Sequence, residues 1–374
     1  MTSLPEQSDA PDAVLGLTAA EYAKRCESAR VPGGVAGALH RYGRLFRDGA
    51  TSQPSLVLSR PPVVHRTQAS PGPEGVTLKF TQVVEGAARG GTPLETESVL
   101  IPMIGRQGER TFTLCVSSQV GCAMGCGFCQ TAQMGLIRSL APAEIVAQWF
   151  AARHRLGHGV SNIVFMGMGE PLDNYDSVIR AIGVLTDHRG PAIPMSKITV
   201  STVGRLDGLR RLKEQVRRPG WHRLGVAVSL NAPNDRVRSA IMPINRAMPM
   251  GELREVLLDW PMHGGFKFCL EYVLIPGVND RPEHARELAE YVRPLPAVVN
   301  LIPYNPRQDS PWPAPGEEAV EAFLGWLTAA GAYAKRRRTK GRDTMAACGQ
   351  LGNPALRRRP QTPRVLAGMA PPTG

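Results

Sequence analysis

Six apolar, β-rich runs alternate with longer amphipathic stretches, and this alternation restricts the possible folds of the chain more than any other feature. The strand candidates cover residues 111–118, 162–169, 197–204, 223–230, 267–275 and 298–305. Helix candidates follow them at residues 142–156, 175–187, 206–216, 250–260, 282–292 and 317–330. Successive strand–helix units predict an α/β domain with a parallel sheet, either open and doubly wound or closed wholly or partly into a barrel.

Small and polar residues crowd the carboxyl ends of the predicted strands. Because these ends meet at one edge of a parallel sheet, we expect the side chains there to converge on one functional rim. Each residue alone is also compatible with an ordinary loop, since Ser and Asn are common turn formers. The positions are Gly169 and Glu170 after the second strand, Ser201 in the third, Ser229, Leu230 and Asn231 at the fourth, and Asn305 at the sixth.

Smaller segments flank the predicted core. Residues 14–50 predict two short amphipathic helices broken at Pro32, Gly33 and Gly34. Residues 76–84 and 96–104 are two apolar runs around a Gly-rich turn, which predicts a β-hairpin. We therefore expect a helical appendage (1–50), a linker and β-hairpin extension (51–105), an α/β core (106–334) and a basic C-terminal segment (335–374).

Charge and hydropathy narrow the class of protein. The formal net charge is +12 and the pI is about 9.7, which favours polyanionic partners such as nucleic acid, although general solubility is the alternative reading. Basic residues gather at 335–340 and 357–359, where they could hold phosphates. We expect a cytoplasmic protein without a membrane span or secretion signal, so that its cysteines stay reduced.

Three of the seven cysteines, Cys122, Cys126 and Cys129, form a C-x3-C-x2-C loop directly after the first predicted strand. A structural zinc site usually takes four protein ligands in two close pairs, and no second pair lies nearby. A cubane iron–sulfur cluster held by three cysteines keeps one iron open for a ligand. The spacing favours such a cluster, while a partial zinc site or reduced structural thiols remain the alternatives.

The loop resembles the signature of the radical S-adenosylmethionine (SAM) superfamily. Phe128 before the third cysteine and the Gly169–Glu170 pair match further features of that superfamily. The resemblance implies a 4Fe-4S cluster on the three cysteines, SAM bound to its open iron, and formation of a 5′-deoxyadenosyl radical. It also implies a partial (β/α)6 barrel similar to a TIM barrel.

Two further cysteines narrow the resemblance. Cys115 precedes the loop and Cys348 lies near the chain end; Cys26 and Cys269 are assigned no function. With "TLCVSSQVGCAMGCGFCQTAQMG", "MGMGEPLDN" and "AACGQL", residues 97–352 closely resemble the RlmN/Cfr family of radical methyltransferases. This implies methylation of an adenine ring carbon in 23S ribosomal RNA, and carbon 2 is the commoner target in the family.

The same resemblance implies a role for each site residue. Cys348 takes a methyl group and carries the carbon to the base, Cys115 releases the product through a transient disulfide, and Glu97 accepts the ring proton, two SAM molecules being used per turnover. Glu97 could instead be a solvated hairpin carboxylate. Cofactor contacts carry over to Gly169, Glu170, Ser201, Ser229, Leu230, Asn231 and Asn305. Asn231 departs from the "SLH" triplet usual in the family.

The resemblance also suggests partners and alternatives. We expect a monomer that acts on 23S ribosomal RNA before ribosome assembly, with flavodoxin or ferredoxin as electron donor. The short N-terminal region argues against transfer RNA as a second substrate. Alternatives are methylation at adenine carbon 8, which confers antibiotic resistance, methylation of another RNA, and a non-catalytic Fe-S or zinc RNA-binding protein. The last has no need of Cys348 and Cys115.

Overall fold

A single ten-stranded sheet forms the centre of the protein. The computed structural model describes residues 13–51, 63–87, 91–105, 108–338, 340–353 and 356. The strand order is β1-β2-β3-β4-β7-β8-β9-β10-β11-β12, and every pair from β4 to β12 is parallel. All six predicted strands are present as β4 (Arg110–Cys115), β7 (Val160–Phe165), β8 (Ile198–Thr202), β9 (Gly225–Ser229), β10 (Phe268–Leu274) and β11 (Ala297–Pro303). The predicted α/β class with a parallel sheet is therefore confirmed.

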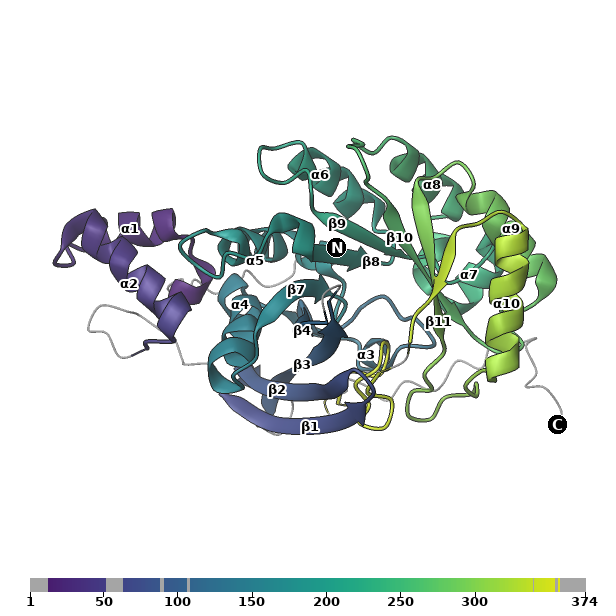
Figure 1. Ribbon diagram of the computed structural model, residues 1–374, viewed down its shortest axis with the longest axis horizontal. Coiled ribbons are helices and arrows are strands. Elements are labelled where there is room, and N and C mark those ends of the chain that lie inside the picture. The colour runs from purple at the N-terminus through teal and green to yellow at the C-terminus, as the bar shows by residue number, and fades with distance from the viewer. Residues whose placement is uncertain are drawn as a thin grey trace.

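The six predicted helices are also present and pack along the parallel part of the sheet (Figure 1). They are α4 (Pro142–Phe150), which continues as a π-helical turn (Ala151–Arg155), α5 (Tyr175–Thr186), α6 (Leu206–Val216), α8 (Met250–Leu258), α9 (Pro282–Val292) and α10 (Glu317–Ala329). A seventh core helix, α7 (Asp235–Ile241), was not predicted. The side chain of Asn234 begins it by accepting a hydrogen bond from Val237 N at 3.0 Å.

An antiparallel extension joins the parallel sheet at β4. The predicted hairpin is confirmed as β2 (Gly75–Ala87) and β3 (Pro93–Ile104), and an unpredicted β1 (Val64–Gly72) pairs with β2. Val99 of β3 lies opposite Cys115 of β4. Glu97, two residues from Val99, is therefore carried past the carboxyl end of β4, where Ser117 Oγ donates to the Glu97 carbonyl at 2.6 Å.

The two predicted N-terminal helices are α1 (Ala19–Ser28) and α2 (Gly34–Asp48), which project from one end of the molecule (Figure 1). Thr18 and Glu21 form a capping box at the start of α1. Tyr42 OH donates to Leu17 O at 2.9 Å, and the apolar faces of both helices belong to the hydrophobic core that continues through the sheet domain. The proposed boundaries near residues 50, 105 and 334 stay predictions.

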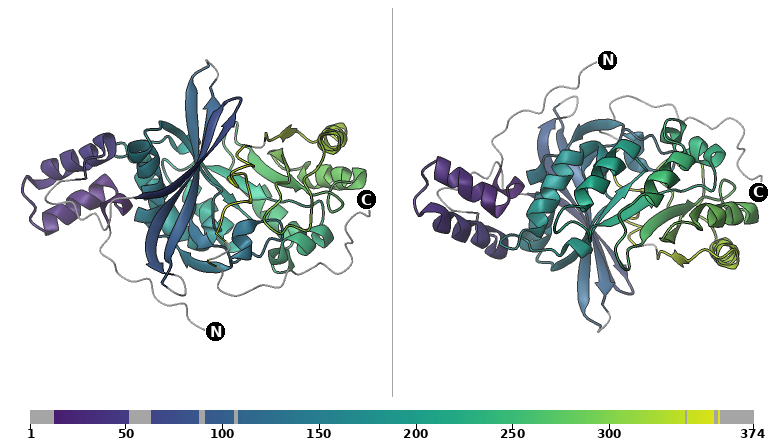
Figure 2. Two further views of the ribbon diagram at one scale, coloured as in Figure 1. Left: turned by 90° about the horizontal axis from the view of Figure 1, so that it is seen from below. Right: turned by 90° about the horizontal axis from the view of Figure 1, so that it is seen from above.

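The last described strand lies at the edge of the sheet opposite β1. A short strand, β12 (Ala334–Arg336), adds parallel to β11, and the segment after it returns between the antiparallel extension and the parallel strands, drawn in yellow in Figure 2. No helix in the described part of the chain is long and apolar enough to cross a membrane. Residues 357–359, one of the two basic groups, lie outside the described residues.

Candidate active site

A cavity opens at the carboxyl ends of the parallel strands, where the sequence predicts a functional rim. It collects residues from β7, β8, β9, β10 and β11, from the cysteine loop and from the C-terminal segment. Of the predicted site residues, it is lined by Cys122, Cys126, Cys129, Gly169, Glu170, Ser201, Ser229, Asn231, Asn305 and Cys348. The structure thus brings together most of the residues that the sequence singled out.

Three predicted residues lie outside this lining. Leu230 is fully buried in the hydrophobic core and is not among the residues that line the cavity. Cys115, the last residue of β4, is buried, and this burial, together with the nearby Cys348, raises the pKa of its thiol. Glu97 is buried and accepts a hydrogen bond from Gly352 N at 3.1 Å, four residues beyond Cys348.

The cysteine loop is closed at its base by a small two-stranded sheet. β5 (Gln119–Gly121) pairs antiparallel with β6 (Leu136–Ser139), and Cys122 N donates to Gly135 O at 3.1 Å. Within the closed loop, burial raises the pKa of all three thiols, so they are protonated until they bind a metal. Three thiols on one short loop are a suitable donor set for iron.

The described residues hold no group of three or more His, Cys, Asp or Glu side chains placed to bind a metal ion. In a cubane cluster each cysteine binds a different iron atom, so three such thiolates stand apart. A cluster of this size requires that all three cysteines line one cavity, and Cys122, Cys126 and Cys129 do so.

Gly121 permits the closure of the loop. Its φ is +77°, and a Cβ atom there would lie 1.9 Å from Gly135 O. We expect Gly121→Ala to lower the free energy of unfolding by about 2–5 kcal/mol, because it combines backbone strain with a steric clash. Gly135→Ala is the matched control, since its φ is +67° but no atom lies within 4 Å of the added Cβ. Urea denaturation measures both losses, and equal losses would contradict this account.

Glu170 is the carboxylate at the base of the cavity. Its two oxygens accept hydrogen bonds from Leu172 N at 3.0 Å and Val203 N at 2.9 Å. Burial nevertheless raises the pKa of Glu170 to about 7. The preceding Gly169 has φ +102° and sits so close to Gln119 that a Cβ would approach its side chain to 2.6 Å. This close approach lets the turn after β7 pack directly against Gln119, which begins the short strand leading into the cysteine loop.

A buried carboxylate on β10, Glu271, lines the same cavity and connects the other strand ends. Glu271 Oε2 accepts hydrogen bonds from Ser201 Oγ at 2.9 Å and Ser229 Oγ at 3.3 Å. Sequence reasoning missed Glu271, although it is the only charged residue in the run "FCLEYVLI". A charge inside an otherwise apolar strand was the signal that could have found it.

Asn231 has a left-handed backbone with φ +58°, which Asn tolerates better than most residues. Its Oδ1 accepts a hydrogen bond from Val273 N at 3.0 Å. The departure from the usual "SLH" triplet is therefore compatible with the local backbone. After β11, Asn305 Oδ1 accepts a hydrogen bond from Arg342 Nε at 3.0 Å.

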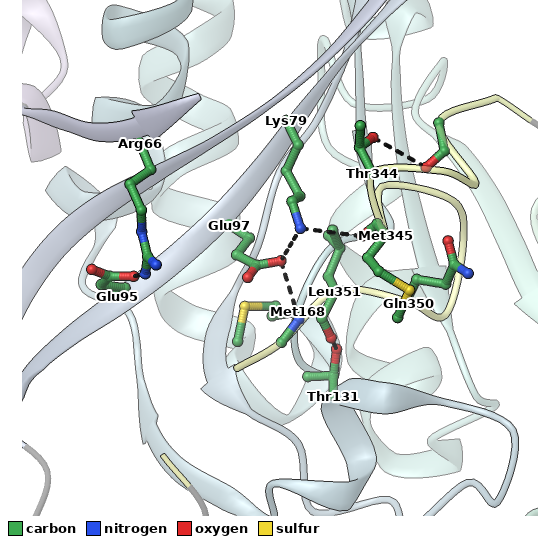
Figure 3. A network of polar contacts seen from close by, with 12 residues as sticks. Arg66, Lys79, Glu95, Glu97, Thr131, Met168, Thr344, Met345, Gln350 and Leu351 are labelled. Atoms are coloured by element: carbon green, nitrogen blue, oxygen red, sulfur yellow. Dashed lines mark hydrogen bonds and ion pairs between the residues drawn. The ribbon is translucent and has the colours of Figure 1, made fainter. Parts of the chain in front are cut away.

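The segment that carries Cys348 is fixed to both sides of the cavity. Gln130 N donates to Gly349 O at 2.7 Å, and Thr131 Oγ1 donates to Leu351 O at 2.6 Å. The residues directly after Cys129 therefore bind the segment that carries Cys348. Figure 3 shows Lys79 of β2 on the other side, where its Nζ lies 3.8 Å from Glu97 Oε2 and 3.4 Å from Met345 O.

The basic residues before Cys348 are largely occupied by ion pairs. Arg336 pairs with Glu317 and Glu321, Lys340 with Glu74, and Arg338 with Glu74 at 3.6 Å. Lys335 lies over the ring of Tyr333. These contacts secure β12 and the following segment to the protein, and they weaken the idea that residues 335–340 serve mainly to hold phosphates.

Comparison with known proteins points to the same superfamily as the sequence motifs. A model of the family described as "Radical SAM superfamily" matches residues 116–290. A probable dual-specificity RNA methyltransferase RlmN 1 of Protochlamydia amoebophila is 46% identical over 71% of this chain and 72% of its own length. The dual-specificity RNA methyltransferase RlmN of Phenylobacterium zucineum is 40% identical over 83% of this chain and 78% of its own.

A solved structure has the same fold. The crystal structure of a radical SAM methyltransferase from Sphaerobacter thermophilus superposes with a TM-score of 0.80 and is 36% identical in sequence. The match covers 91% of this chain and 99% of the other. The resemblance therefore extends from the cysteine loop to the whole domain.

Proposed function

Because this chain belongs to the RlmN family of radical SAM RNA methyltransferases, we propose that it methylates carbon 2 of an adenine in 23S ribosomal RNA. The observation that carries the proposal is the position of Cys348, which lines the same cavity as Cys122, Cys126 and Cys129. A thiol beside a radical-generating centre can transfer a carbon atom to a base. A non-catalytic Fe-S or zinc protein would not require a thiol at this position.

The family implies a 4Fe-4S cluster and SAM. Cys122, Cys126 and Cys129 would hold the cluster, and Gly169 and Glu170 would hold the methionine end of SAM beside it. The remaining contacts would come from Ser201, Ser229, Asn231, Asn305 and the backbone of Leu230. When bound, these groups supply methyl carbon and a 5′-deoxyadenosyl radical. Burial raises the pKa of Glu170 to about 7. The positively charged amino group of SAM would stabilise the carboxylate form of Glu170.

Cys348 acts as a thiolate nucleophile that accepts the methyl group on Sγ and keeps the carbon in place while it joins the adenine ring. Cys115 then releases the product. Its thiolate attacks Cys348 Sγ, a disulfide bond forms, and the S–C bond breaks; the electron pair stays on the transferred carbon, which takes up a proton and becomes the methyl group of the base.

Glu97 accepts the proton that the ring carbon loses. Its position supports this role, because it contacts the segment that carries Cys348 and is shielded from water. Burial raises the pKa of Glu97, and nearby Lys79 acts in the opposite direction. A carboxylate with a raised pKa is a stronger base than one in water.

We expect the rate of product release to fall as the pH drops through the raised pKa of Glu97, because only the carboxylate accepts a proton. Glu97→Gln should slow release by about 10²–10⁴-fold and remove this pH dependence. Lys79→Met should shift the acidic limb to higher pH, since the cation that lowers the pKa of Glu97 is lost. Single-turnover measurement of free methylated RNA across the pH range gives these rates.

Glu95→Gln is the control for this series. Glu95 is also on β3 but pairs with His65 and with Arg66, on the far side of Glu97 from Met345 (Figure 3). Its charge contributes to the raised pKa of Glu97, so its variant should move the acidic limb to lower pH but keep a release rate that depends on pH. A pH profile that is the same for Glu97→Gln as for Glu95→Gln would remove Glu97 from the mechanism.

The test of the function itself is anaerobic reconstitution with iron, sulfide and SAM, followed by mass mapping of modified adenines in 23S RNA fragments. Methylation at carbon 2, with formation of 5′-deoxyadenosine, is the expected result. Methylation at carbon 8 would favour the resistance-type activity. If neither methylated adenine nor 5′-deoxyadenosine forms, the proposal that the protein is an enzyme is refuted. The same assay with transfer RNA tests the expectation that transfer RNA is not a second substrate. The relatives are named dual-specificity RNA methyltransferases, and these names speak against that expectation.

A further inference from the structure

Arg238 of helix α7 is the largest fully buried side chain in the described part of the protein, and it carries a charge. Its Nε donates to Leu230 O at 3.0 Å, and its Nη1 donates to Asn245 Oδ1 at 2.8 Å. Its Nη2 donates to Val203 O at 2.5 Å and to Ser229 O at 3.2 Å. The acceptors are therefore neutral oxygen atoms, and three of them are backbone carbonyls.

The three carbonyls belong to the ends of two paired strands of the parallel sheet. Val203 directly follows β8, Ser229 is the last residue of β9, and Leu230 comes next. The same two strand ends carry Ser201 and Ser229, whose side chains lie at the cavity. One planar guanidinium therefore joins the two backbones that present these serines.

The bridge reaches two further cavity residues through the backbone. Val203 N donates to Glu170 Oε2 at 2.9 Å, so Glu170 fixes one polar group of Val203 and Arg238 fixes the other. The peptide between Leu230 and Asn231 is also held at both of its polar groups. Arg238 binds its carbonyl, and its N–H donates to a backbone carbonyl of β10 at 3.0 Å. This peptide leads into the left-handed backbone of Asn231.

Helix α7 connects the bridge to the cysteine loop. Asn245 accepts from Arg238, and its own Nδ2 donates to Asp235 Oδ1 at 2.8 Å in the first turn of α7. At the last residue of α7, Ile241 O accepts a hydrogen bond from Gly127 N at 2.8 Å. The element that carries Arg238 is therefore also bound to the loop that carries the three cysteines.

The burial of a cation at this position requires a reason. Removal of a charge from water is costly, and an apolar side chain of similar volume often gives equal or greater stability. An apolar side chain cannot join three carbonyls, and the single ammonium group of lysine lacks the planar fork of an arginine. Arg238 therefore supplies a fixed geometry between strand ends in addition to packing.

We propose that Arg238 is a positioning residue for SAM, which holds the ends of β8 and β9 at the spacing that the cofactor requires. The inference rests on the proposed function, because that function assigns SAM to the residues at these strand ends. Arg238 is not among the residues that line the cavity, so it acts through the backbone carbonyls that it binds. Strand ends that are already ordered lower the entropic cost of binding SAM, and this cost rises when the bridge is lost.

The test compares SAM binding by reconstituted full-length proteins. Arg238→Met fills similar space but removes the guanidinium. We expect its dissociation constant for SAM, measured by equilibrium dialysis, to rise by about tenfold or more, with the iron and sulfide content of the original protein. The electron paramagnetic resonance spectrum of the reduced cluster should still change when SAM is added, but at a correspondingly higher concentration. At saturating SAM, the rate of 5′-deoxyadenosine formation should return to within a few-fold of the original.

Two further variants separate the bridge from charge and from stability. Arg238→Lys keeps a positive charge but cannot span the same carbonyls, so its dissociation constant should lie between those of the original protein and Arg238→Met. Tyr42→Ala removes a fully buried ring from helix α2, away from the cavity residues, and should leave the affinity for SAM unchanged. Full affinity in Arg238→Lys, or an equal loss in Tyr42→Ala, would overturn the inference. Arg238→Lys also decides the question if Arg238→Met does not fold.

SAM binding is measured without RNA, so the two conclusions fail separately. An unchanged SAM affinity in Arg238→Met, with RNA methylated by the original protein, would refute the role of Arg238 alone. A selective loss of SAM affinity in Arg238→Met, with no adenine methylated by the original protein, would refute the proposed function and leave the positioning role of Arg238 standing.

Discussion

Replacing Cys348 with alanine should abolish RNA methylation, with a loss of at least about a thousandfold in the amount of methylated adenine per enzyme. Cys348 Sγ is the atom on which the proposed mechanism carries the transferred carbon, and no other thiol of the C-terminal segment lines the described cavity. Alanine removes the carrier without removing any residue assigned to the cofactor. Liquid chromatography and mass spectrometry of digested RNA measure the product.

Two controls make this result specific. Cys26→Ala alters a buried thiol of helix α1, far along the chain from the cavity residues, and should leave methylation within a few-fold of the original. Binding of SAM to the reconstituted Cys348→Ala protein should persist. Methylation that continues in Cys348→Ala would show that the carbon reaches the base by another route.

Replacing Cys115 with alanine should trap RNA on the protein. Without the second thiolate, the S–C bond between Cys348 and the base has no nucleophile to break it, so the reaction should stop at less than one turnover. Denaturing gel electrophoresis of labelled RNA should then reveal a covalent protein–RNA species. Nuclease digestion and mass spectrometry should place the remaining nucleotide on Cys348.

The double variant Cys115→Ala/Cys348→Ala is the matched control for the trapped species. It lacks the atom that forms the adduct and should give no cross-linked RNA, although the cavity and its cofactor residues are retained. A freely released methylated product from Cys115→Ala, or an adduct in the double variant, would contradict the resolving role of Cys115.

Most of the sheet was predictable because its strands have strong local signals. The six core strands are short apolar runs followed by amphipathic helices, and both features depend on the sequence of each element alone. β1 was missed because its exposed, polar residues lie in a Pro/Ser/Gly-rich stretch and gain their order by pairing with β2. β12 was missed because three residues, Ala-Lys-Arg, are too few to show a period.

The site was predictable only where residues had a recognisable pattern. The spacing of the three cysteines and the Gly169–Glu170 pair are local features, so the sequence places them at a strand end. Lys79, Glu271 and Arg238 matter through contacts between distant segments: Glu271 meets residues from β8, β9 and the segment after β12. Such contacts depend on the register of the whole sheet, which no short motif encodes.

The backbone hydrogen bond from Gln130 to Gly349 joins the residue after the third cysteine to the residue after Cys348. The loop assigned to the iron–sulfur cluster and the loop that presents the nucleophile therefore share an anchor. By thermodynamic linkage, an event that orders one loop lowers the entropic cost of ordering the other, and the effect is reciprocal. We therefore expect a chain without its cluster to accept a methyl group on Cys348 more slowly than the reconstituted protein.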